Sequence, residues 1–210
     1  VDAPLSDAYG TDAEIVVRET AAADLDAALA GSESAQLVQQ ITEPVVDIVS
    51  ELDGQVAGET AVFLDGRRSQ VRTQETNLGN LTADANLAAA NMVDGETVLV
   101  SLKNGGGIRN AIGEVAADGT LLPPQANDVA DPPRDAGEVS RLSIEDSLRF
   151  NNRLTIMELS SEDLLAILEH GVAQSGPGST PGRFPQVGGV SFSFDVDRAP
   201  GDRVREVTVA

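Results

Sequence analysis

Apolar residues recur at helical spacing in three parts of the chain. Between residues 34 and 52 they fall every three or four positions, which predicts an amphipathic helix that Pro44 kinks or splits. A second helix is predicted over residues 77–92. A third begins at Ser160, whose capping-box partner is Asp163 three residues later.

Other apolar runs favour strands. Residues 190–196 alternate apolar and polar side chains, which is typical of a strand buried on one face. Shorter apolar runs predict further strands at 56–64, 98–102, 154–159 and 204–209, and a short helix is expected at 144–148. Because helices alternate with mostly hairpin-like strands, the expected fold class is α+β, a mixed sheet with packed helices.

The chain is expected to hold one domain preceded by a junction. Residues 1–32 are rich in Ala and Asp and suggest a linker, with a short strand at 16–17 and a helix over 21–30. Residues 33–210 form the predicted domain. Inside it, 118–137 contains four Pro and few large apolar residues, so a mobile loop is expected there.

The charge narrows the range of partners. The 210 residues carry 34 acidic and 14 basic side chains, a net charge of −20, and Lys103 is the only lysine. Such a field repels nucleic acid and anionic membranes, so neither is an expected partner, and a nucleotide site would need a local arginine cluster. Either adaptation to high salt or a GC-rich genome would explain this acidic composition with a single lysine.

One glycine-rich segment carries candidate chemistry. The sequence NGGGIR, residues 104–109, follows a predicted strand, and Gly106 and Gly107 let the backbone approach a ligand closely. Asn104 offers an amide, and Arg109 offers a guanidinium suited to phosphate. The segment is not a Walker P-loop, and a purely structural bend is the alternative interpretation.

Further candidates are weaker when taken singly. Arg72 and Arg67 precede the second helix and supply positive charge, while Phe150 is either a core residue or a platform for a stacked base. His170 is the one histidine, so a two-metal site is not expected. The sequence thus offers no catalytic residue and no metal ligand set.

Four segments in order resemble a known family. They are ETNLGNLTADA (75–85), NGGGIR (104–109), LRFNNRLTIMELSSEDLLAILEHGV (148–172) and GRFPQVGGVSFSFDVDRAPGDRV (182–204). Together they resemble the C-terminal, substrate-recognition domain of the 5'-nucleotidase family, from about residue 63 to the end. The chain is identified as such a domain, truncated at its C-terminus.

The resemblance implies that catalysis and substrate binding are carried by separate domains. In that family an upstream metallophosphatase domain holds two divalent metal ions, and the C-terminal domain binds a nucleotide or a nucleoside-diphosphate sugar. It implies phosphate or ribose contacts for Asn104 and Arg109, and base stacking for Phe150. Gln74 occupies a position where relatives often carry arginine, so the role of Arg72 is left open. It also implies an extracellular, periplasmic or cell-surface location.

The metal motifs of the upstream domain do not occur in this sequence. Three hypotheses follow: a recognition domain of a metal-dependent phosphohydrolase that is not catalytic by itself, a stand-alone nucleotide or sugar-nucleotide binding module, and a remnant without a ligand.

Overall fold

The computed structural model describes residues 32–95 and 97–209. The chain divides into two compact units, 1–48 and 49–210. The elements expected at 16–17 and 21–30 lie outside the described residues, and the predicted boundary at residue 33 stays a prediction.

The first predicted helix is confirmed as α2, Glu33–Gly54. Pro44 lies inside it, and the helix continues on both sides, so the predicted split does not occur. Seven apolar side chains along this helix are exposed: Leu37, Val38, Ile41, Val45, Val46, Ile48 and Val49.

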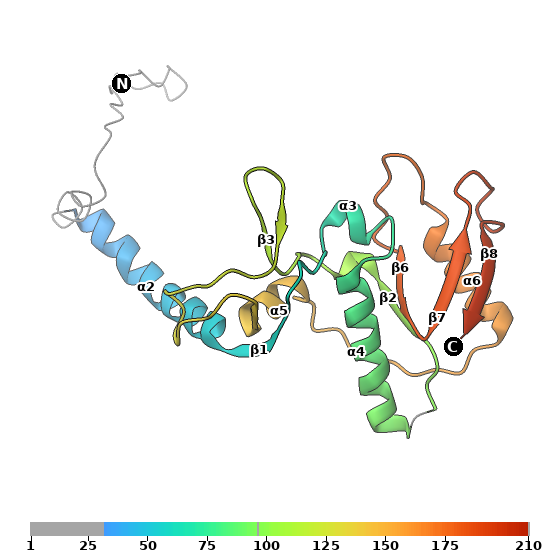
Figure 1. Ribbon diagram of the computed structural model, residues 1–210, viewed down its shortest axis with the longest axis horizontal. Helices are drawn as coiled ribbons and strands as arrows, with labels where there is room; N and C mark the ends of the chain where they lie inside the picture. Colours follow the sequence, from blue (N-terminus) through green and yellow to red (C-terminus); the bar gives the residue numbers. More distant parts are fainter. Residues whose placement is uncertain (1–31, 96, 210) are drawn as a thin grey trace, which may run out of the picture. The chain divides into compact units, whose positions relative to one another are not determined.

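The second predicted helix is α4, Asn77–Asp94, which packs on a two-stranded sheet (Figure 1). The N-cap is Thr76, whose hydroxyl accepts a hydrogen bond from the Gly79 amide at 3.0 Å. The sheet pairs β2, Ser101–Asn104, antiparallel with β6, Pro185–Gly188. β2 therefore begins three residues later than the sequence predicts.

The buried face of α4 is made of small side chains. Leu81, Ala85, Ala88 and Ala89, predicted to share one side with the buried Leu78, are not buried. The buried positions beside Leu78 are instead Gly79, Thr82, Ala83 and Ala90. A Cβ added to Gly188 of β6 would lie 2.7 Å from the Asp84 side-chain oxygen and 3.2 Å from the Ala83 carbonyl carbon, so a larger residue there would require the helix to shift.

A hairpin and one helix form the C-terminal part of the described chain. β7, Val190–Phe194, pairs antiparallel with β8, Val204–Val209, and α6, Ser161–Val172, packs against β8 (Figure 1). The capping box predicted at the start of α6 is confirmed. Leu168 and Val172 are buried as expected, whereas Leu165 is exposed.

Short elements complete unit 49–210. They are β1 (Val56–Glu59), α3 (Arg68–Val71), the 3-10 turn η1 (Gly105–Gly107), β3 (Glu114–Val115), β4 (Leu121–Leu122), β5 (Glu138–Ser140) and α5 (Arg141–Ser147). β1 pairs with β5, and β3 pairs with β4. The expected loop 118–137 is partly regular, because it contains β4 and a bridge between Asn127 and Arg134.

The strand predicted at 154–159 does not form. Residues 151–160 have no regular structure and are exposed, including Leu154, Ile156 and Leu159. The apolar pattern is that of a strand, but a strand needs a hydrogen-bonding partner, and the structure pairs none with this segment in the described residues.

The fold is α+β, as predicted from the sequence. Its described strands pair in four separate two-stranded antiparallel sheets rather than in one mixed sheet. The main apolar cluster brings together six buried residues from segments far apart in the sequence: Leu64, Val71, Leu78, Ile108, Ile112 and Val139. Val71 and Ile108 of this cluster directly precede Arg72 and Arg109, so the core anchors the backbone of both arginines.

Candidate functional site

Strand β2 leads directly into a tight turn that carries the candidate residues. The strand ends at Asn104, and the glycine turn, Gly105–Gly107, follows as η1. The Gly105 amide donates to the Phe184 carbonyl at 2.7 Å, and the Gly106 amide donates to the Gly182 carbonyl at 2.8 Å. The segment just before β6 therefore holds the turn in place.

Packing explains two of the three glycines. A Cβ on Gly105 would lie 2.1 Å from the Val71 carbonyl oxygen, and one on Gly106 would lie 2.7 Å from the Gly182 carbonyl oxygen. Gly107 differs, because a Cβ there would meet only the Asn104 side chain, at 3.4 Å, which is an ordinary contact. Packing therefore does not require a glycine at position 107.

Arg109 and Phe150 lie together on the surface. The guanidinium carbon of Arg109 is 5.6 Å from the centroid of the Phe150 ring. The Arg109 amide donates to the carbonyl of Ser147, the last residue of α5, at 2.8 Å, which ties the two segments together. Phe150 is 50% exposed, so it is not a core residue. A planar ring with this exposure is free to stack on a ligand.

Arg72 is buried and its charge is unmatched. It follows α3, is 8% exposed, and its Nε is buried without a hydrogen-bond partner. Burial lowers the pKa of Arg72, and the positive charges of Arg68 and Arg109 lower it further. Among the described residues no carboxylate forms an ion pair with Arg72 or Arg109, although the chain as a whole is strongly acidic.

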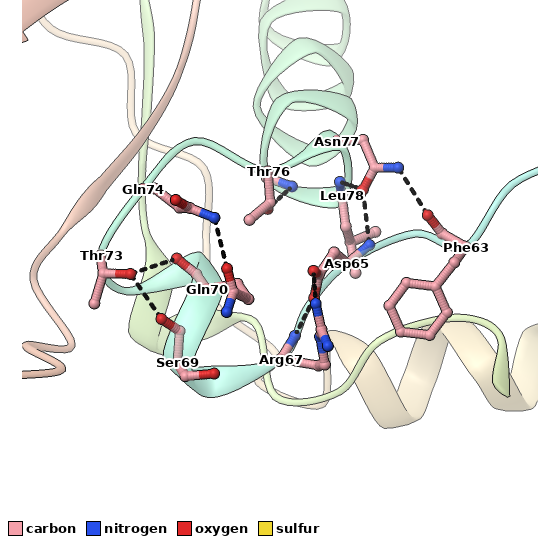
Figure 2. Close-up of polar contacts among 11 residues, drawn as sticks. Phe63, Asp65, Arg67, Ser69, Gln70, Thr73, Gln74, Thr76, Asn77 and Leu78 are labelled. Carbon is pink, nitrogen blue, oxygen red and sulfur yellow. Dashed lines mark hydrogen bonds and ion pairs between the residues drawn. The ribbon is translucent and has the colours of Figure 1, made fainter. Parts of the chain in front are cut away.

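Hydrogen bonds join Asn77, at the start of α4, to the chain that precedes α3 (Figure 2). The Asn77 side chain donates to the Phe63 carbonyl at 2.8 Å and accepts from the Asp65 amide at 2.7 Å. Arg67, predicted to supply positive charge, forms an ion pair with Asp65 at 2.6 Å. Its charge is therefore neutralised locally, in contrast to that of Arg72.

Three of the six candidate residues, Asn104, Arg109 and Phe150, are exposed, whereas Arg72 is buried. Asn104 donates from its side chain to the Gly182 carbonyl at 3.3 Å, beside Gly106 and Gly107. The six predicted residues line neither of two cavities elsewhere in the described chain. One, of about 300 Å³, is lined by Ala111, Ile112, Gly113, Leu142, Ser143 and Asp146, and the other, of about 550 Å³, lies beside α6.

Sequence reasoning missed Gln186, which is 1% exposed. Its side chain forms hydrogen bonds with backbone groups of Val71, Gln74 and Thr76, which lie more than a hundred positions earlier in the chain. A lone glutamine in a strand pattern carries no signal of such a role.

The described residues contain no group of three or more His, Cys, Asp or Glu side chains that could hold a metal ion. His170 instead lies 3.2 Å from the Arg183 guanidinium. The described residues therefore do not fit a catalytic metal site. No helix in the described part of the chain is long and apolar enough to cross a membrane.

Comparison with known proteins decides the family. A family model described as "5'-nucleotidase, C-terminal domain" matches residues 56–210. The chain belongs to this family. Its 5'-nucleotidase C-terminal domain thus includes every candidate site residue, and the glycine turn lies inside the matched region.

Relatives and a solved structure agree with this assignment. The chain is 32% identical over 177 residues to the trifunctional nucleotide phosphoesterase protein YfkN of Bacillus subtilis, covering 84% of this chain and 10% of that protein. It is 31% identical over 159 residues to a 5'-nucleotidase of Bos taurus, covering 74% of this chain and 24% of that protein.

The crystal structure of a 5'-nucleotidase precursor from Thermus thermophilus superposes with a TM-score of 0.62 at 33% identity. The match covers 84% of this chain and 28% of that one. The chain thus spans less than a third of each of these relatives.

Proposed function

We propose that this chain is the nucleotide-recognition domain of a metal-dependent 5'-nucleotidase and that it is not catalytic by itself. In this proposal Arg72, Arg109, Asn104 and the glycine turn bind the phosphate side of the nucleotide, and Phe150 stacks on the base. The two divalent metal ions belong to a metallophosphatase domain upstream in the longer protein.

The unmatched charge of Arg72 carries the proposal. An unpaired buried charge is costly, so a protein keeps one where a ligand of opposite sign completes it. Arg72 has two further arginines close by and no carboxylate partner in the described chain. In a protein of net charge −20, two arginines left without acidic partners favour an anionic ligand.

The glycine at position 107 supports the same proposal. Neither packing nor a positive φ angle explains why this position is glycine. A phosphate or ribose oxygen beside Asn104 would explain it, because such a ligand needs close approach to the backbone.

A paired measurement on the full 210-residue chain tests the proposal. Binding of AMP and of adenosine is measured by NMR titration for the wild type and for Arg72→Gln. We expect Arg72→Gln to weaken AMP binding about tenfold and to leave adenosine binding almost unchanged, because a hydrogen bond to a charged group contributes about 1.5–3 kcal/mol.

The same variant should be more stable than the wild type, since it removes an unpaired buried charge. A rise in thermal midpoint together with a loss of AMP binding would separate a ligand-binding role from a structural one. Equal binding of AMP by both proteins would refute the proposal, whatever the change in stability.

The names of the relatives support the proposed cellular location. The Thermus protein is described as a precursor, which favours export, and we propose an extracellular, periplasmic or cell-surface location and a role in nucleotide catabolism. A nucleoside-diphosphate sugar is the alternative ligand, and competition with UDP-glucose in the same titration distinguishes the two.

A further inference from the structure

Gln186 of β6 is fully buried, and its side-chain amide forms hydrogen bonds through both its nitrogen and its oxygen. Its Nε2 donates to the Val71 carbonyl at 2.9 Å and to the Gln74 carbonyl at 2.8 Å, and its Oε1 lies 3.3 Å from the Thr76 amide, which donates to it. Both donor hydrogens and the acceptor oxygen are thus engaged with backbone groups.

These backbone groups lie on both sides of Arg72. Val71 precedes it directly, and Gln74 and Thr76 follow it within four residues. The Arg72 side chain has no hydrogen bond to any described residue. Its position is therefore set by the backbone that Gln186 holds.

The short segment 182–186, which ends at Gln186, also holds the glycine turn. The carbonyls of Gly182 and Phe184, just before Gln186, accept from Gly106 and Gly105. The Val71 carbonyl that Gln186 binds lies against Gly105, where a Cβ would be only 2.1 Å away. Residues 182–186 thus connect the two halves of the candidate site.

Gly79 of α4 makes room for this arrangement. A Cβ at Gly79 would lie 1.9 Å from the Gln186 side-chain oxygen, so any other residue there would displace the amide. The first turn of α4 can therefore lie this close to Gln186 of β6 because residue 79 has no side chain.

We infer that Gln186 is a positioning residue, which holds Arg72 beside the glycine turn so that its guanidinium meets the phosphate of the nucleotide. This inference rests on the proposed function. Gln186 touches no ligand itself and acts through the backbone on either side of Arg72.

Gln186→Glu tests the inference with the smallest change in shape. A carboxylate cannot donate to the Val71 and Gln74 carbonyls, so the backbone around Arg72 moves while the rest of the side chain stays. Gln125→Glu is the matched control, because it makes the same substitution at a partly buried glutamine that donates only to the Pro123 carbonyl, at 2.7 Å.

AMP and adenosine binding are measured by NMR titration on the full chain, with circular dichroism to verify folding. We expect Gln186→Glu to weaken AMP binding about fivefold, because it misplaces one charge-assisted contact. Adenosine binding should change less than about twofold. Gln125→Glu should change neither ligand. In an Arg72→Gln background, Gln186→Glu should add almost nothing to the loss of AMP binding.

Each outcome is decisive. If Arg72→Gln alone leaves AMP binding unchanged, the proposed function fails. If Arg72→Gln weakens AMP but Gln186→Glu does not, or if it weakens AMP and adenosine equally, only this inference fails. Should Gln186→Glu not fold, the neutral Gln186→Met replaces it, and unfolding of both variants would make Gln186 a stability residue and overturn the inference.

Discussion

Phe150 exposes half of its surface beside the guanidinium of Arg109, and the two side chains form one platform. The ring offers a face for a base, while the guanidinium lies on the phosphate side in the proposed arrangement. Their contact also holds each side chain in place before a ligand arrives, which reduces the entropy lost on binding.

Replacing Phe150 by Ala should weaken AMP and adenosine together, because both contain the base. Base–aromatic stacking contributes about 1–3 kcal/mol, so at least about fivefold weaker binding is expected by calorimetry or NMR titration. Phe150→Tyr keeps the ring and serves as the control. Loss of AMP binding alone would place Phe150 near the phosphate and contradict the stacking role.

A sequence motif marks part of the candidate site, and ligand binding by these residues stays a prediction. Asn104 and Arg109 flank the glycine run, and the structure places Arg109 next to Phe150, 41 positions later in the chain (150 − 109). The burial of Arg72 and the role of Gln186 were not predictable. Both depend on contacts between residues far apart in the sequence, and a single arginine or glutamine has no periodic pattern.

At the scale of elements, the C-terminal end of α2 is tied to the region around β5 by a buried charged network. Asp53 accepts hydrogen bonds from Ser140 at 2.6 Å and from Asn127 at 2.7 Å, and its carboxylate lies 3.3 Å from the Arg134 guanidinium. Burial alone would raise the pKa of Asp53. The two hydrogen bonds and the charge of Arg134 outweigh that effect and lower the pKa.

Asp53→Ala should destabilise the fold by about 3 kcal/mol, since it leaves the buried Arg134 with its hydrogen bond to the Glu138 carbonyl but without a carboxylate partner. The pH dependence has a definite sign. A carboxylate with a lowered folded-state pKa stabilises the fold above its unfolded pKa of about 3.9, and this stability is lost as pH falls through the folded-state pKa.

Urea denaturation of the wild type and of Asp53→Ala at several pH values from neutral to strongly acidic measures both effects. The difference in stability between the two proteins should shrink as the pH falls. A difference that stays constant well below the unfolded pKa of about 3.9 would contradict this account. Arg141→Ala, which removes an exposed ion pair with Glu145, is a control expected to cost under about 1 kcal/mol.

Helices were more predictable than strands, for a physical reason. α2, α4 and α6 each satisfy most of their backbone hydrogen bonds locally, so sequence spacing and caps such as Ser160 are sufficient. A strand depends on a partner that sequence alone does not identify. Residues 154–159 have the apolar pattern of a strand but no partner in the described chain, and the expected strand is absent.

At the scale of the whole molecule, the proposed function assigns the two metal ions needed for hydrolysis to an upstream domain. Two-metal hydrolysis needs several His and carboxylate ligands around ions about 4 Å apart. The chain contains one histidine, and its described residues hold no cluster of possible ligands.

The purified chain should therefore release no phosphate from AMP, even with Mn²⁺, Zn²⁺ or Co²⁺ added. A colorimetric phosphate assay over several hours measures this, with each metal tested with and without EDTA. Release that depends on the metal and stops with EDTA would show that the chain is an enzyme in its own right.

The exposed segment 151–160 has a practical consequence. It contains Arg153, where trypsin would cut the folded chain with little obstruction. The cut would leave Arg72, Arg109 and Phe150 on one fragment and Gln186 on the other, still joined by the pairing of β2 with β6. The two fragments, produced as separate polypeptides, would then recover the proposed nucleotide site only when they reassemble.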